Sequence, residues 1–234
     1  TRFIDNPVFS IIETNKKYQN YLHSHPLSWN DTPEVINNIF NEIQESQNYQ
    51  LYMHKEKITF EDHKQLILKI FVDIITQNEL FFQTLEDKSI FWNDDYELVF
   101  GMVYKSLKNI KENTTEEDNF FHPVYNTEED TDFARTLLRK TILDYDENIK
   151  TIDKFTHNWE IERISDMDKL IMATAISELK YFPSIPVKVT LDEFIEISKS
   201  YSSLKSSAFI NGILDKVVAL LKDSNQLNKS GRGL

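Results

Sequence analysis

The sequence predicts an all-α protein: a helical bundle in the carboxyl part and an additional acidic helical region before it. Glycine and proline number only four and six among 234 residues, and these two residue types most often interrupt regular elements. Between them, long stretches repeat apolar residues every three to four positions, which is the period of an amphipathic helix. Several of these stretches also open with residues that favour a helix start. Together these three observations favour helices over most of the chain.

Four helix starts are predicted in the first half. Proline at residue 7, after Asn6, suits a first helical turn. A second helix opens at residues 32–34 (Thr-Pro-Glu) and carries an apolar stripe. Residues 59–62 (Thr-Phe-Glu-Asp) resemble a capping arrangement before a long third helix, which we expect to continue to about Leu85. Asp94 or Asp95 is the expected cap of the fourth. The apolar stripe of the second helix comprises Val35, Ile36, Ile39, Phe40 and Ile43.

The second half is expected to follow a polar, acidic loop at residues 111–129. A long helix then begins at Asp132, and another spans residues 165–181. Residues 190–193 (Thr-Leu-Asp-Glu) have the form of a capping box for the next helix. The last helix is capped by Ser206 or Ser207 in this prediction and contains Gly212. Because glycine inside a helix costs about 1 kcal/mol relative to alanine, we expect a close helix–helix crossing at Gly212.

Charge divides the chain unevenly. The net charge is −12, and residues 1–130 hold 23 acidic and 11 basic side chains, so all of the excess acid lies there. Such a surface repels phosphate and makes the first part a poor platform for nucleic acid. We therefore divide the chain into an acidic helical region (1–129), a helical bundle (130–222) and a basic tail (223–234).

Common catalytic and cofactor motifs are missing from the sequence. Two histidines at positions 23 and 25, with His54 and His63, lack the spacing of a zinc site, and the chain has no cysteine. Neither a glycine-rich phosphate loop nor a Gly-x-Ser-x-Gly elbow occurs. We therefore predict a protein that is not an enzyme and has no cofactor and no metal. The absence of an apolar run of roughly 18 residues predicts no membrane span, and the lack of cysteine suits a cytoplasmic location.

One segment has the composition of a phosphate site. Residues 205–209 (Lys-Ser-Ser-Ala-Phe) combine a cation, two hydroxyls, an aromatic ring and the backbone N–H groups of a helix start. Helix starts attract phosphate through the helix dipole and unpaired donors. The alternative is an ordinary serine cap with Phe209 in the core, and the chemistry of the residues alone favours that alternative.

The carboxyl part contains a series of short motifs, of which the most specific is Phe-Ile-Asn-Gly-Ile-Leu-Asp-Lys at 209–216. The motifs before it, in order, are Trp159, Arg163–Ile164, Met167–Lys169, Glu178–Leu179, Ile185–Val189, Asp192–Glu193 and Ser198–Lys199. In these motifs, over roughly residues 130–221, the chain resembles the NusB family of transcription antitermination factors. The acidic first part is similar to the extended version of the protein found in some bacteria. Membership implies two small helical bundles.

The resemblance also implies partners and a site. Family members bind boxA RNA together with the small-subunit ribosomal protein NusE and help to load an antitermination complex on RNA polymerase. The RNA-binding loop of the family corresponds to Lys205, Ser206, Ser207 and Phe209, and the acidic helix start that faces the protein partner corresponds to Asp168, with Glu162 nearby. Formation of a homodimer stays open.

Two departures accompany this resemblance. The family's Arg-rich first helix has no match in the chain, which begins with Thr1 and not Met; we expect a fragment or a processed product. Ala173 stands where the family usually has a basic residue.

Two other functions are alternatives to an antitermination factor. The chain could be the RNA-binding module of a ribosomal RNA methyltransferase or a purely protein–protein helical interaction domain.

Overall fold

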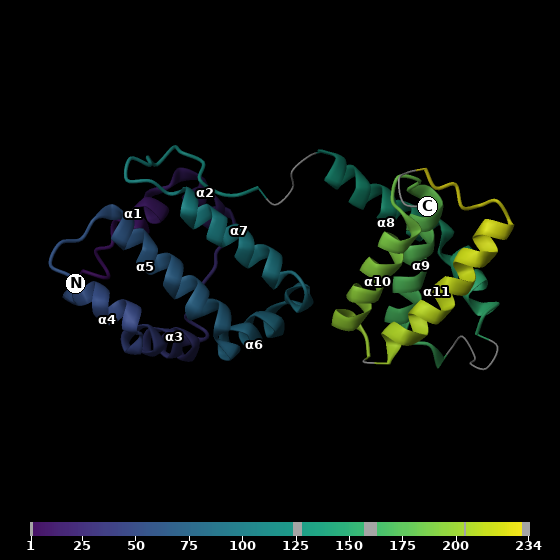
Figure 1. Cartoon of the computed structure of the whole chain (residues 1–234), viewed down its shortest axis with the longest axis horizontal. Coiled ribbons are helices and arrows are strands. Elements are labelled where there is room, and N and C mark those ends of the chain that lie inside the picture. The colour runs from purple at the N-terminus through teal and green to yellow at the C-terminus, as the bar shows by residue number, and fades with distance from the viewer. Residues whose placement is uncertain (1, 124–127, 157–162, 204, 231–234) are drawn as a thin grey trace. The chain divides into compact units, whose positions relative to one another are not determined.

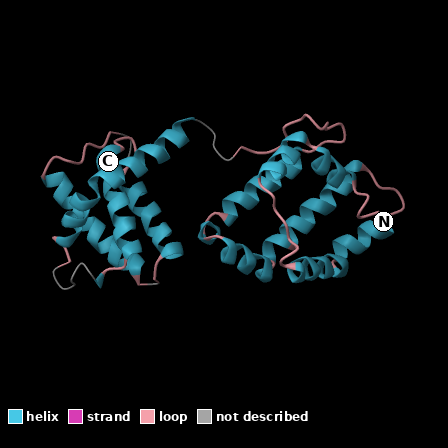
Figure 2. Cartoon of the chain, turned by 180° about the vertical axis from the view of Figure 1, so that it is seen from behind, coloured by secondary structure: helices cyan, strands magenta, loops and turns pink. Residues whose placement is uncertain are grey.

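The regular elements of the chain are all helical within the residues that the structure describes. The computed structural model describes residues 2–123, 128–156, 163–203 and 205–230, and within these ranges it contains helices and loops but no strand (Figure 2). The predicted all-α class is confirmed. None of the described helices is long and apolar enough to span a membrane.

The chain divides into two compact units, residues 1–124 and 125–234. Figure 1 labels their helices. The first unit contains α1 (Pro7–Thr14), α2 (Lys16–Ser24), α3 (Pro33–Glu45), α4 (Gln47–His54), α5 (Phe60–Asp73), the 3-10 turn η1 (Ile75–Gln77), α6 (Glu79–Lys88), the 3-10 turn η2 (Ile90–Asn93) and α7 (Tyr96–Asn109). The second contains α8 (Glu128–Asp153), α9 (Asp166–Tyr181), α10 (Val187–Tyr201) and α11 (Ser206–Asp223).

Side-chain caps begin several helices of the first unit. The Asn6 carboxamide oxygen accepts a hydrogen bond from the backbone N–H of Val8 at 2.9 Å, with Pro7 in the first turn of α1. Thr59 and Asp62 form a complete capping box at the start of α5, because each side chain accepts from the other's backbone N–H. Both predicted starts are confirmed. Such caps satisfy donors that the helix itself leaves unpaired.

The expected continuation of the third helix to Leu85 is wrong. The α-helix ends at Asp73, and a new helix, α6, begins after Asn78. The Asn78 side chain accepts from the backbone N–H of Phe81 at 2.8 Å and donates to Asn38 and Glu42 of α3. Asn78 therefore caps α6 and binds it to α3, which an uninterrupted helix could not do.

Burial within the first unit departs from the predicted pattern on α3. Only Val35 and Ile43 of the α3 stripe are buried, whereas Ile36 and Phe40 are 44% and 41% exposed. The loop after α7 contributes to the core, since Phe120 is 6% exposed and packs with Val8 and Ile67. The predicted acidic loop is therefore partly an element of the core. Residues 124–127 of that loop lie outside the described residues.

Helix α9 is the centre of the second unit. It contacts α8, α10 and α11, and Figure 1 shows these helices side by side. Ser165 caps α9 by accepting from the backbone N–H of Asp168 at 3.1 Å, so the helix begins close to the predicted start at residue 165. The preceding helix, α8, begins at Glu128, four residues before the predicted Asp132. The buried core of the unit comprises Ile152, Ile164, Ile171, Met172, Ala175, Ile176, Leu179, Phe194, Ile210, Ile213, Leu214, Val217, Val218 and Leu221.

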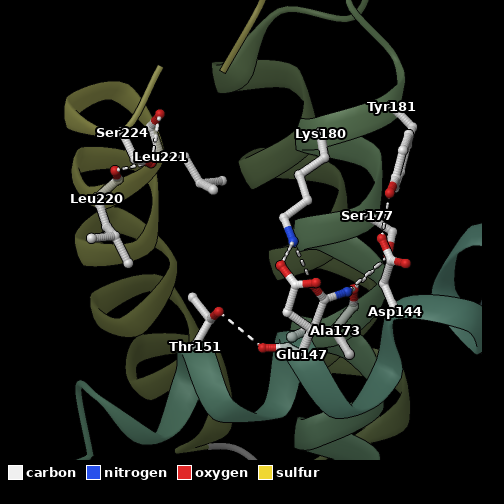
Figure 3. A network of polar contacts seen from close by, with 11 residues as sticks. Asp144, Glu147, Thr151, Ala173, Ser177, Lys180, Tyr181, Leu220, Leu221 and Ser224 are labelled. Carbon is white, nitrogen blue, oxygen red and sulfur yellow. Dashed lines mark hydrogen bonds and ion pairs between the residues drawn. The ribbon is translucent and has the colours of Figure 1, made fainter. Parts of the chain in front are cut away.

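A polar network joins α8 to α9 (Figure 3). The fully buried Asn148 donates to the Ala173 carbonyl at 3.1 Å and to the Ser177 hydroxyl at 3.0 Å. Lys180 donates to Glu147 and to the Asn148 carboxamide oxygen. Buried polar groups are tolerated where they are paired in this way. The network therefore fixes the register of α8 along α9.

Two local expectations in the second unit are wrong. Thr190 is buried inside α10, which begins at Val187, so residues 190–193 are not a capping box. Gly212 is exposed, and a Cβ atom added there would meet nothing within 4 Å. No close helix crossing within the described residues therefore requires this glycine.

The chain after α11 folds back onto α9. Leu227 packs against the core of the second unit. The Lys229 ammonium group donates to the Phe182 carbonyl at 2.9 Å, and the Ser230 N–H donates to the Pro183 carbonyl at 2.8 Å. A cation at these carbonyls suits the negative end of a helix dipole. Residues 224–230 therefore close the carboxyl end of α9.

Candidate nucleic-acid interface

The predicted RNA-binding residues lie at the start of α11, just after the loop that leaves α10. Lys205 precedes the helix and is exposed, whereas Ser206 is its first residue and is 5% exposed. Ser207 and Phe209 are half-buried, and Phe209 packs against the core of the second unit. No side chain caps α11 within the described residues, so the expected cap by Ser206 or Ser207 is wrong.

The Ser206 hydroxyl instead points to Asp168, in the first turn of α9. It donates to one carboxylate oxygen at 3.0 Å, and the Ser202 hydroxyl donates to the other. Asp168 is 7% exposed as a result. The structure thus brings together two groups that were predicted to serve different ligands, namely Ser206 for RNA and Asp168 for a protein partner. Glu162, the other predicted partner-binding residue, lies outside the described residues.

The hydroxyl protons of this cluster all point inward. A carboxylate only accepts hydrogen bonds, and each serine hydroxyl has a single proton. Ser202 and Ser206 give theirs to Asp168, so the 2.8 Å contact between the Ser203 and Ser206 hydroxyls must use the Ser203 proton. The Ser206 backbone N–H also donates to the Ser203 carbonyl at 2.9 Å. We call Asp168, Ser202, Ser203 and Ser206 the serine–aspartate cluster.

A cavity of about 450 Å³ opens beside this cluster. Its walls include the basic side chains of Arg163 and Lys205, the apolar side chain of Ile164 and the ring of Phe209, and the serine–aspartate cluster forms the remainder with Ser165. A cation next to an aromatic ring and an apolar wall is a suitable environment for an unstacked base and its phosphate. The arrangement therefore suits the binding of a nucleotide.

Sequence reasoning missed three residues of this site. Arg163 was noticed only as part of a motif, and Ser202 and Ser203 were not singled out. The signal was present in the serine-rich run at 198–207, which contains more hydroxyls than a helix cap needs. Asp168 could not be paired with that run from spacing, because 34 and 38 positions separate it from Ser202 and Ser206.

A second cavity of comparable size, about 470 Å³, lies between α10, α11 and the tail. Lys188, Lys222 and Lys229 line it, but Asp192 and Asp215 do so too, and no aromatic ring is present among its lining residues. We therefore place the candidate interface at the cavity beside Phe209. No group of three His, Asp or Glu side chains among the described residues is arranged to hold a metal ion.

Comparison with known proteins identifies the family of the chain. The NusB family model matches residues 94–219, more than half of the chain. The match begins within the first unit, earlier than the predicted coverage from about 130, and takes in all of α7.

Curated relatives agree with this match. The chain is 44% identical over 103 residues to "Transcription antitermination protein NusB" of Salinibacter ruber, covering 44% of this chain and 64% of the relative. It is also 44% identical over 105 residues to the protein of that name from Chloroherpeton thalassium, covering 43% and 50%.

A solved NusB structure from T. maritima is 31% identical, with 43% of this chain and 70% of that one covered and a TM-score of 0.38. The matched region thus spans about half to two thirds of the length of these curated relatives. The match of the family model over more than half of the sequence, together with these relatives, shows that the chain belongs to the NusB family.

Proposed function

We propose that this chain acts in transcription antitermination by binding single-stranded RNA of the boxA type, together with the small-subunit ribosomal protein NusE. The observation that carries the RNA part is the cavity of about 450 Å³ between Lys205, Arg163 and Phe209. Family membership supports the transcriptional role, since the curated relatives are named for it. The protein recognises RNA without catalysis in this proposal, as part of a complex on RNA polymerase.

Each side chain of the interface has a distinct role. The exposed Lys205 pairs with a phosphate, and the Phe209 ring faces a base displaced from the stack. Arg163 lines the same cavity and can pair with phosphate bidentately. Ser206 stabilises the loop and does not bind RNA through its hydroxyl, because that hydroxyl donates a hydrogen bond to Asp168. Ser207 is half-buried in the first turn and does not line the cavity, so its contact with the RNA backbone stays a prediction.

Contact with the ribosomal protein is the finer part of the proposal. Acidic residues near the start of α9 would meet a basic partner, and complementary charge would raise the rate of association. The roles predicted for Asp168 and Glu162 stay predictions.

Reversal of the Lys205 charge tests the RNA site. Lys205→Glu should weaken binding of boxA-like RNA several-fold and reduce the salt dependence of log K by about 0.7, the contribution of one phosphate contact on a single strand. Fluorescence anisotropy with boxA-like and scrambled RNA, with and without NusE, measures both quantities. Stability should hardly change, because Lys205 is exposed.

Lys216→Glu is the matched control. It lies on the same helix and is exposed, 11 residues or roughly 16 Å further along the axis, so its charge reversal should weaken binding less. Equal losses from both variants would place the RNA elsewhere. If boxA-like and scrambled RNA bind equally with NusE present, the antitermination function itself is contradicted.

A further inference from the structure

The serine–aspartate cluster connects the interface to the start of another helix. Asp168 belongs to the first turn of α9, and its carboxylate holds both Ser202 at the end of α10 and Ser206 at the start of α11. Lys205 lies between these two serines in the sequence. We propose that Asp168 is a positioning residue that holds the loop between α10 and α11 in the form that binds RNA. This inference rests on the proposed function.

Asp168 borders the cavity, but its carboxylate is occupied by serines and acts on RNA through the loop. It is 7% exposed, and both of its carboxylate oxygens accept hydrogen bonds from serines. The Ser203 hydroxyl then donates to Ser206, so the contacts from α9 reach the residues on both sides of Lys205. A loop held at its two ends loses less conformational entropy when RNA binds, and a preorganised site therefore binds more tightly.

The negative charge of Asp168 opposes RNA binding, whereas its hydrogen bonds to the loop favour it. A carboxylate close to a phosphate site repels RNA. Because Asp168 is buried, water and salt screen this repulsion less than they would for an exposed carboxylate. Removal of the charge alone should therefore strengthen RNA binding. Loss of the hydrogen bonds from Ser202 and Ser206 to Asp168 should weaken RNA binding. Because the two effects have opposite signs, the sign of the change in affinity identifies the role of Asp168.

Asp166 provides a matched control for charge. It lies in the same first turn of α9, but its side chain is 99% exposed and pairs with Lys169 at 3.1 Å. Asp166→Asn removes the same formal charge and a similar interaction with the helix dipole. It leaves the hydrogen bonds between Asp168 and the serines intact. Its effect on RNA binding should be absent or slightly favourable.

Asp168→Asn, made in the whole chain, tests the positioning role of Asp168. An amide offers one accepting oxygen where the carboxylate offered two, so one serine can no longer donate to residue 168. The hydrogen bonds of the cluster, including the 3.0 Å contact between the Ser202 and Ser206 hydroxyls, must then rearrange. We expect single-stranded boxA-like RNA to bind roughly fivefold more weakly, with a salt dependence reduced by about 0.7 as Lys205 loses its contact. Affinity equal to or tighter than that of the unmodified chain would overturn the inference.

A double-mutant cycle separates positioning from a general loss of structure. If Asp168 acts through Lys205, the effect of Asp168→Asn should largely disappear in a Lys205→Gln background. Additive losses from the two changes would overturn the inference. Should Asp168→Asn fail to fold by circular dichroism, Ser202→Ala removes one donor to the carboxylate and should weaken binding in the same direction; unchanged affinity in a folded Ser202→Ala chain would also overturn it.

The same measurements distinguish this inference from the proposed function. If Lys205→Gln leaves RNA affinity unchanged, the RNA binds elsewhere. Both the proposed site and the positioning role of Asp168 are then contradicted. If Lys205→Gln weakens binding while Asp168→Asn does not, the site stands and only the positioning role is lost.

Discussion

Glu178 of α9 is a carboxylate in an environment that disfavours its charge. It is 6% exposed, and burial raises its pKa above the ordinary range, although Thr190 and Lys229 oppose the rise. Burial likewise lowers the pKa of Lys229. The attraction between the two groups therefore does not offset the loss of water around each.

Because of this environment, we expect Glu178→Gln to stabilise the fold in a pH-dependent manner. An acid whose pKa is higher in the folded state destabilises the fold above that pKa, and the penalty disappears below its unfolded value of about 4.3. The variant should therefore unfold at a higher temperature than the unmodified chain at about pH 7, and the difference should vanish near pH 4. Thermal unfolding followed by circular dichroism measures it.

Glu193→Gln is the control for this experiment, because Glu193 also raises the pKa of Glu178 but is itself exposed. Its own effect on stability should be within about 0.5 kcal/mol. An advantage of Glu178→Gln that is the same at both pH values would contradict the assignment.

The site shows how far residue-level reading of a sequence can reach. Lys205 and Phe209 were identified from their types and from a family motif, and both line the cavity. The burial of Asp168 and its bonds to Ser202 and Ser206 could not be predicted, because the contact depends on the packing of α9 against α10 and α11. Whether a polar residue faces a ligand or another residue is decided by tertiary structure.

Helix boundaries were predictable where the signal is local. Asn6, Thr59 and Ser165 cap their helices through residues two or three positions further on, so the sequence contains the whole interaction. Thr190 has the same local pattern but lies inside α10. At Asn78 the decisive partners are in α3. Local patterns therefore predicted helix starts more reliably than helix continuity.

Gly212 gives a prediction for α11. Because a Cβ atom there would meet nothing within 4 Å, Gly212→Ala should stabilise the second unit by about 0.5–1 kcal/mol through the higher helix propensity of alanine. Urea unfolding measures the gain. Gly101→Ala in α7 of the first unit is the matched variant, since its Cβ atom would also be unhindered. Destabilisation by Gly212→Ala would reveal a packing contact at this position.

At the scale of the whole molecule, charge and candidate interface belong to different parts of the chain. Residues 1–130 carry the entire net charge of −12, whereas residues 131–234 hold 15 basic and 15 acidic side chains and are neutral. The cavity beside Phe209 lies in the neutral part. An acidic region in the same chain opposes the approach of RNA at long range, and salt screens that effect.

A fragment of residues 125–234 tests this opposition. Its core is formed within the unit, so it should retain its helical circular dichroism spectrum. With a net charge of −3 instead of −12, it should bind single-stranded RNA more tightly than the whole chain at about 50 mM salt, and the difference should shrink near 0.3 M as screening shortens the reach of charge. Scrambled RNA should gain as much as boxA-like RNA, because repulsion does not depend on sequence. Tighter binding by the whole chain at low salt would instead mean that residues 1–124 contribute contacts strong enough to overcome their own charge.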